Sequence, residues 1–161
     1  MNRPLHLLFD WGDTLMADLP GQAGSMWRWP EVRAMPGAYD TLATLAGRLP
    51  CHVATNAAES GADDVRLALA RVGLDDLVGR VFCRRELGLA KSDPAFYRRI
   101  AAELGVAPPQ LWMIGDSLAN DVHSARAAGL TAIWLNAAGA APPPGVPAIA
   151  ALLQLLELLA D

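Results

Sequence analysis

Short apolar runs of strand length alternate with helix-forming stretches along most of the sequence, and this alternation limits the fold more than any other feature. The runs lie at residues 5–9, 51–56, 81–83, 111–116 and 131–135. Apolar residues recur at helical spacing between them, at 36–49, 60–72, 94–104 and 118–128. Because short right-handed crossovers join parallel strands through helices, the pattern predicts an α/β fold. We expect a Rossmann-like three-layer sandwich with a mainly five-stranded parallel sheet.

The length and apolar content are those of one domain. The 161 residues are 53% hydrophobic and can bury a core, so residues 1–161 are assigned to a single domain. A net charge of −4, with no Lys/Arg cluster longer than a pair, argues against a nucleic-acid footprint. Cys51 and Cys83 lie in separate apolar runs, which favours free thiols in a reducing compartment. No apolar run approaches the roughly 18 residues of a membrane span, so we expect a cytoplasmic protein without membrane contact.

Three segments fall outside the alternation. Residues 15–35 form a loop or small flap, residues 137–147 a Pro/Ala-rich linker, and residues 148–161 an apolar C-terminal helix. The cluster from Met26 to Pro30 either shields a site or packs on the domain edge. Together with the terminal helix it is also a candidate contact for a homo-oligomer.

Polar residues follow the ends of the predicted strands. They are Asp10, Asp13 and Thr14 after the first strand, Thr55 and Asn56 at the second, Lys91 after the third, and Asp116 and Asp121 at and after the fourth. Parallel strands bring their carboxyl ends to one edge of a sheet, where ligands bind. Two aspartates from different strands, with a hydroxyl and a lysine between them, are suited to Mg²⁺ and a phosphoryl group.

Each of these residues also has a plain structural interpretation. Asp10 can cap a turn, and Thr55 can be an ordinary strand end or an N-cap. Lys91 can be a solvated loop charge, and Asp121 can be an acid in the first turn of a helix. The functional interpretation rests on the complete set in its order along the chain.

The residues in this order resemble the haloacid dehalogenase superfamily of phosphohydrolases, over residues 5–136. Residues 10–15 (Asp-Trp-Gly-Asp-Thr-Leu) resemble the first motif of that family, and Thr55-Asn56 the second. Lys91 resembles the third motif, and residues 115–121 resemble the fourth. The first and fourth motifs together are the specific part of the resemblance.

The resemblance implies a nucleophile and a metal site. Asp10 would attack phosphorus and form an aspartyl-phosphate. Asp10 and Asp116 would hold Mg²⁺, with the backbone carbonyl of Gly12 as a further ligand. Asp121 would bind a metal-bound water or orient Lys91.

The resemblance also implies a phosphate site. Thr55 and the amide of Asn56 would donate to the phosphoryl oxygens, and Lys91 would balance the charge that develops on them. The expected activity is a Mg²⁺-dependent hydrolysis of a phosphate monoester, on a phosphorylated small molecule or a larger phosphorylated substrate.

Two features depart from the family. Many members carry a second aspartate two residues after the nucleophile, as acid and base, whereas this sequence has Gly12 there and Asp13 one position further on. Three explanations stay open. In the first, Asp13 reaches the leaving group; in the second, another group or the substrate supplies the proton. In the third, the protein binds phosphorylated ligands with little turnover. Neither gap between the motifs has room for a full cap domain, so residues 15–35 would be a short flap in its place.

Other functions are weighed against this one. A weak or inactive member of the family would bind a phosphorylated ligand or a protein partner. An enzyme acting on a phosphonate or a carbon–halogen bond is a second alternative, but displacement of halide does not need the pair Asp10 and Asp116. A flavodoxin-like binding module would not need these acids at the sheet edge.

Overall fold

Six parallel strands form one sheet in the order β3-β2-β1-β4-β5-β6 in the computed structural model, which describes residues 1–160. The strands are β1 (His6–Phe9), β2 (Cys51–Thr55), β3 (Val81–Cys83), β4 (Leu111–Gly115), β5 (Thr131–Leu135) and β6 (Ala148–Ile149). All neighbouring pairs are parallel. The predicted α/β fold is confirmed, and β6 adds a sixth strand to the five predicted ones.

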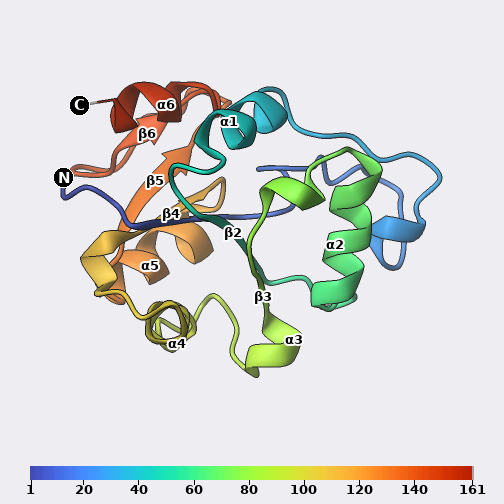
Figure 1. Cartoon of the computed structure of the whole chain (residues 1–161), viewed down its shortest axis with the longest axis horizontal. Helices are drawn as coiled ribbons and strands as arrows, with labels where there is room; N and C mark the ends of the chain where they lie inside the picture. The colour runs from blue at the N-terminus through green and yellow to red at the C-terminus, as the bar shows by residue number, and fades with distance from the viewer. Residues whose placement is uncertain (161) are drawn as a thin grey trace.

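Helices cover both faces of the sheet. They are α1 (Ala38–Leu45), α2 (Ala62–Arg71), α3 (Arg84–Leu87), α4 (Ala95–Leu104), α5 (Ser124–Ala127) and α6 (Gln154–Leu159), with the short turns η1 (Met26–Arg28), η2 (Asp75–Leu77), η3 (Pro108–Gln110) and η4 (Leu118–His123). Figure 1 shows α1 and α6 on one side of the sheet and α4 and α5 on the other. The three layers are therefore helices, sheet and helices.

Side chains alternate between the two faces along each strand, as the pleat of a strand requires. In β1, Leu7 and Phe9 join the core under α1, α2 and α6, while Leu8 joins the core under α4 and α5. All three are fully buried. This burial on both faces explains why β1 is an unbroken apolar run.

Two predicted helices differ in the structure. Residues 118–128 begin as the π-helical turn η4 and continue as the short α5, where one helix is predicted. The predicted C-terminal helix is shorter, because residues 148 and 149 pair with Trp134 and Leu135 as β6, and α6 begins only at Gln154. Leu152 and Leu155 are buried in the core, so the chain itself covers part of this apolar segment.

The flap at residues 15–35 packs beside α2. Its only regular element is η1, and the guanidinium group of Arg71 in α2 donates hydrogen bonds to the carbonyl oxygens of Trp27 and Trp29. A second contact joins the hydroxyls of Ser25 and Ser60, 2.7 Å apart. The flap is therefore anchored to the body of the protein.

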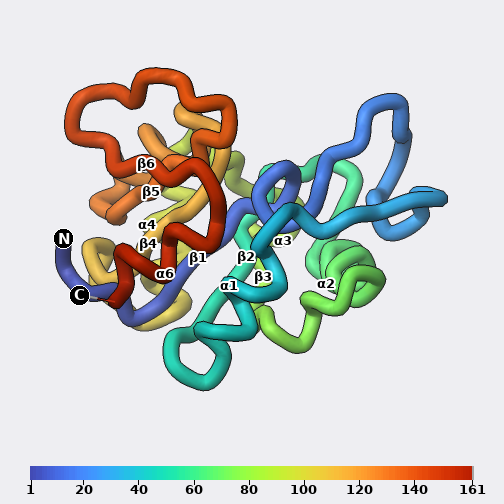
Figure 2. The backbone as a smooth tube through the Cα atoms, turned by 90° about the horizontal axis from the view of Figure 1, so that it is seen from above, coloured from blue at the N-terminus to red at the C-terminus, as the bar shows by residue number. Residues whose placement is uncertain are grey.

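The first described residues and the last ones lie next to each other, as Figures 1 and 2 both show. Among residues 1–160 no helix is long and apolar enough to cross a membrane.

Candidate active site

The carboxyl ends of β1 and β4 bring Asp10 and Asp116, the two predicted metal ligands, to the same edge of the sheet. Phe9 pairs with Ile114, and the amide of Asp10 continues this ladder by donating to the Ile114 carbonyl at 2.9 Å. Asp116 follows β4 directly, and the indole N–H of Trp134 donates to its carbonyl oxygen at 2.9 Å. The register of two central strands thus sets the relative position of the two acids.

Lys91 lies between two carboxylates. Its Nζ is 2.7 Å from Asp10 Oδ1 and 2.8 Å from Asp121 Oδ1. The side chains of Lys91 and Asp121 are 2% and 1% exposed. Burial opposes the charged form of Lys91, but the two carboxylates outweigh it and raise the pKa of the lysine. Lys91, the only lysine in the sequence, is therefore a permanently charged group of the site.

Asp10 is held in its ionised form. Burial favours the neutral acid, but the charge of Lys91 and hydrogen bonds from Asp116 and Lys91 outweigh it and lower the pKa of Asp10. Thr14 Oγ1 donates to Asp10 Oδ2 at 3.3 Å. An ionised, oriented carboxylate is what nucleophilic attack by Asp10 requires.

A glycine lets Asp121 approach the end of β4. A Cβ atom on Gly115 would overlap the carboxylate of Asp121. The amide of Ser117 donates to Asp121 Oδ2 at 3.0 Å, while Asp121 Oδ1 accepts the hydrogen bond from Lys91. Both oxygens of this buried acid therefore have partners.

The predicted phosphate residues Thr55 and Asn56 lie at the end of β2 and line a pocket together with Asp10. Thr55 Oγ1 accepts a hydrogen bond from the Ala57 amide at 3.0 Å, which leaves its own hydroxyl hydrogen free to donate elsewhere. Asn56 Oδ1 accepts from the Lys91 amide at 3.1 Å, so its side chain fixes the loop that carries the lysine. That positioning contact could not be read from the sequence.

Gly12 lines the same pocket, whereas Asp13 is not among its lining residues. Asp13 is exposed, and its φ of 59° lies in the left-handed region that Asp tolerates better than most residues. Its Oδ1 accepts a hydrogen bond from the Asp18 amide at 2.9 Å. The structure therefore places the Asp13 carboxylate within its own turn, and outside the cluster formed by Lys91 and its partners.

The flap supplies pocket residues that the motifs did not indicate. Asp18, Met26 and Trp29 line the pocket from the flap, and Glu59 and Ser60 line it from the loop after β2. No motif spacing marks Asp18, because a loop without regular structure brings it there. The Trp29 side chain lines the pocket and is also buried in the hydrophobic core, so it both borders the site and packs.

Three carboxylates fit a divalent cation. Asp10, Asp116 and Asp121 each present one oxygen, and these atoms all lie within 4.8 Å of one another. The pKa of Asp116 is raised to about 7, chiefly by burial. The hydrogen bond to Asp10 and the charges of Asp10 and Asp121 also raise it. Burial raises the pKa of Asp121 to about 6, against the opposing charge of Lys91. One lysine does not balance three acids, and hard oxygen donors suit Mg²⁺.

We expect stabilisation by Mg²⁺ to increase with pH. In the metal-free protein Asp116 has a pKa of about 7, above its ordinary value of 3.8. Protonated Asp116 therefore stabilises the fold at low pH, and this stability is lost as pH rises through 7. A bound cation removes that loss. Thermal unfolding with Mg²⁺ or EDTA is expected to show a larger Mg²⁺-dependent rise in Tm at pH 8 than at pH 5.5. An equal or larger rise at pH 5.5 would contradict the assignment, and Asp116→Asn is the control.

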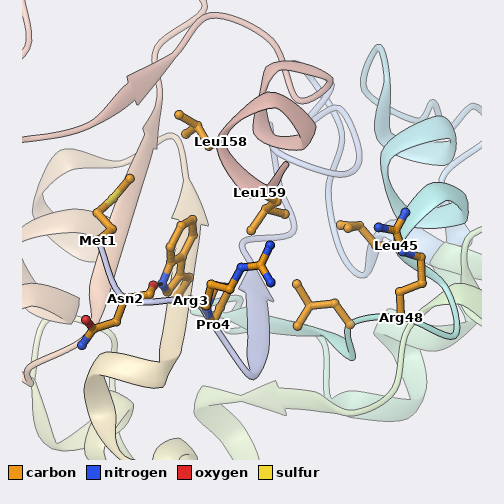
Figure 3. A pocket seen from close by; sticks show the side chains of 10 residues that line it. Met1, Asn2, Arg3, Pro4, Leu45, Arg48, Leu158 and Leu159 are labelled. Carbon is orange, nitrogen blue, oxygen red and sulfur yellow. Dashed lines mark hydrogen bonds between the residues drawn. The ribbon is translucent and has the colours of Figure 1, made fainter. Parts of the chain in front are cut away.

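A second pocket lies at the opposite ends of the strands. Figure 3 shows Arg3, Leu45, Arg48 and Leu159 around it, near the amino ends of β1 and β2. Parallel strands place it on the far edge of the sheet from Asp10. It therefore takes no part in the site described here.

The sheet and the acidic edge define an α/β protein with three clustered carboxylates and a buried lysine at the carboxyl ends of its strands. More particularly, residues 12–129, more than half of the chain, match the haloacid dehalogenase-like hydrolase family, and the chain belongs to that family. The predicted membership is confirmed. The match begins two residues after Asp10, so the role of Asp10 rests on its geometry in the site.

Similar proteins include both a phosphatase and a dehalogenase. The chain is 37% identical over 102 residues to a phosphoglycolate phosphatase of Rhodospirillum rubrum, covering 63% of this chain and 41% of that protein. It is 31% identical to a 2-haloacid dehalogenase structure from Pseudomonas syringae, with a TM-score of 0.69 and coverage of 81% and 54%. An uncharacterised Listeria monocytogenes protein shares the fold at 21% identity, with a TM-score of 0.82 over 96% of this chain and 97% of that one. The chain spans less than half the length of the curated relatives it matches.

Proposed function

We propose that the protein is a Mg²⁺-dependent phosphohydrolase that cleaves a phosphate monoester through an aspartyl-phosphate on Asp10. The observation that carries this proposal is the position of the Lys91 ammonium, 2.7 Å from Asp10 and 2.8 Å from Asp121, with Asp116 in the same cluster. Such an arrangement orients an ionised nucleophile beside fixed positive charge. Attack on an anionic phosphate needs both.

Each residue has a role in this proposal. Asp10 Oδ2 is the attacking atom, because Oδ1 is held by the Lys91 ammonium at 2.7 Å, whereas the contact from Thr14 to Oδ2 is longer, at 3.3 Å. Thr55 and the Asn56 amide donate to the phosphoryl oxygens, and Lys91 balances the developing charge. Asp10, Asp116, Asp121 and the Gly12 carbonyl would hold Mg²⁺, which when bound neutralises charge on the phosphoryl group.

The substrate class follows from the relatives and the pocket. Relatives named as phosphatases support a phosphate monoester over a haloacid, and the three-acid cluster supports it independently, because displacement of halide needs no cation. The ligand is a phosphorylated small molecule or a larger phosphorylated substrate that enters between the flap and the loop after β2. We also propose a cytoplasmic location, which agrees with the free thiols of Cys51 and Cys83.

Hydrolysis of a panel of phosphate monoesters, including p-nitrophenyl phosphate, tests the proposal. We expect turnover in Mg²⁺ that EDTA abolishes and added Mg²⁺ restores. Halide release from a 2-haloacid, with no phosphate release, would instead assign the dehalogenase function. No turnover of any panel member, with Mg²⁺-dependent binding of inorganic phosphate, would favour the alternative of an inactive ligand-binding protein.

A further inference from the structure

We propose that Asp18 is the general acid and base of the reaction and uses the space that a glycine at position 12 leaves open. The inference rests on the phosphohydrolase function proposed above. An alcohol leaves phosphorus easily only if its oxygen receives a proton, and water attacks easily only if it loses one. The site therefore needs a carboxyl group other than the nucleophile.

The pocket offers two candidates. The carboxylates that line it are Asp10, Asp18 and Glu59, and Asp10 is the proposed nucleophile. A Cβ atom built on Gly12 would lie 3.8 Å from the Cβ of Asp18. Residue 12 is two positions after the nucleophile Asp10. The Asp18 side chain therefore starts beside the position that a side chain at residue 12 would occupy. A Cβ atom at residue 12 would be in ordinary van der Waals contact with Asp18, so the space beside Asp18 can accept a side chain there.

The turn that follows Asp10 holds Asp18 in place. Asp13 Oδ1 accepts the Asp18 amide hydrogen at 2.9 Å, and the Asp13 amide donates to the Met16 carbonyl at 2.6 Å. The next residue back from Asp18, Ala17, donates its amide to the Arg33 carbonyl at 2.9 Å. Asp13 is in this account a positioning residue, and its carboxylate acts through Asp18.

Glu59 is the weaker candidate. It follows Thr55 and Asn56 on the loop after β2, on the side of the pocket assigned to the phosphoryl oxygens. Asp18 shares the wall formed by Gly12 and the turn after Asp10. The leaving group and the attacking water need a carboxyl group beside the nucleophile, so Asp18 is favoured.

The proton balance closes over two steps. Asp10 attacks phosphorus, the bond to the ester oxygen breaks with its electron pair on that oxygen, and Asp18 gives that oxygen its proton. Water then attacks phosphorus and gives a proton to the Asp18 carboxylate, while the bond between phosphorus and the Asp10 oxygen breaks with its electron pair on Asp10. The products are an alcohol and inorganic phosphate, and both aspartates return to their starting forms.

The test compares two leaving groups in Asp18→Asn. For β-glycerophosphate, whose alkoxide needs a proton, we expect kcat to fall by about 10²–10⁴-fold. For p-nitrophenyl phosphate, whose phenolate leaves without one, we expect a rapid burst of about one equivalent per site followed by slow turnover. A merely structural role would also slow turnover but would give no burst with p-nitrophenyl phosphate. Glu59→Gln is the matched control and is expected to keep the wild-type ratio of the two kcat values.

Two further variants separate Asp18 from Asp13. Asp13→Asn keeps an acceptor oxygen for the Asp18 amide, so we expect kcat to fall by less than about tenfold, whereas an acid at Asp13 would lose about 10²–10⁴-fold. The double variant Gly12→Asp/Asp18→Asn places a carboxyl group in the open space and is expected to recover part of the β-glycerophosphate activity.

The outcomes distinguish this inference from the function on which it rests. Wild-type turnover with an unchanged substrate ratio in Asp18→Asn would overturn the role of Asp18 and leave the phosphohydrolase intact. A shifted ratio in Glu59→Gln or Asp13→Asn alone would overturn it in favour of that residue. A wild-type protein with no Mg²⁺-dependent turnover of any ester in the panel would overturn both.

Discussion

Replacement of Asp10 by asparagine is expected to reduce phosphate monoester hydrolysis to background, a loss of about 10³-fold or more. The amide lacks the charge that attacks phosphorus, and Asp10 is the carboxylate that contacts both Lys91 and Thr14. The change is nearly isosteric, and an asparagine oxygen still accepts a hydrogen bond from Lys91 Nζ. We therefore expect the fold to persist, as circular dichroism and the Tm would report.

The matched control is Asp76→Asn, at an exposed acid of η2. It makes the same chemical change away from the pocket and is expected to leave kcat and KM as in the wild type. Retention of more than about a tenth of wild-type activity by Asp10→Asn, after correction for deamidation by mass spectrometry, would contradict a nucleophilic Asp10.

Removal of the Lys91 charge is expected to cost the most stability of any single change at the site. Lys91→Met keeps the length and much of the volume of the side chain but leaves Asp10 and Asp121 without their buried counter-charge. Breaking a buried ion pair in this way costs about 3–5 kcal/mol in the free energy of unfolding. Urea unfolding in EDTA measures this loss.

The pH dependence identifies the cause of the Lys91 effect. Without the lysine the lowered pKa of Asp10 rises and the raised pKa of Asp121 rises further, so protonation at pH 5.5 relieves part of the cost that is present at pH 8. Arg99→Met is the control, because its pair with Glu103 is exposed, and it is expected to cost less than about 0.5 kcal/mol. A loss in Lys91→Met as small as that of the control, at both pH values, would show that Lys91 is not a buried counter-ion.

The central part of the site could be predicted because it depends on strand ends. An apolar run that stops at Asp10 and another that stops at Asp116 are visible in the sequence, and parallel pairing brings such ends together. Lys91 was predicted from its place in the order of motifs. Its near-complete burial between two acids depends on tertiary packing and became visible only in the structure.

The remaining features depend on contacts that leave no periodic signal. Asp18 reaches Gly12 through a loop, and the hydrogen bond that holds it joins Asp13 to a residue five positions on. The π-helical turn η4 arises where Asp121 is held by the Ser117 amide and Lys91, and a 3.6-residue pattern cannot distinguish it from an α-helix. Strand β6 forms because β5 offers it an edge, although its own sequence lies beside a Pro-rich linker.

The most direct test of a phosphohydrolase acting through Asp10 is to trap the phosphorylated enzyme. The protein with Mg²⁺ would be mixed with p-nitrophenyl phosphate, quenched in acid within milliseconds to seconds, digested and examined by mass spectrometry, with Asp10→Asn in parallel. We predict a hydroxylamine-sensitive phosphoryl group on the peptide that contains Asp10, and none in the variant. Turnover of the ester with no phosphoryl group on Asp10, or with one on another residue, would contradict the mechanism.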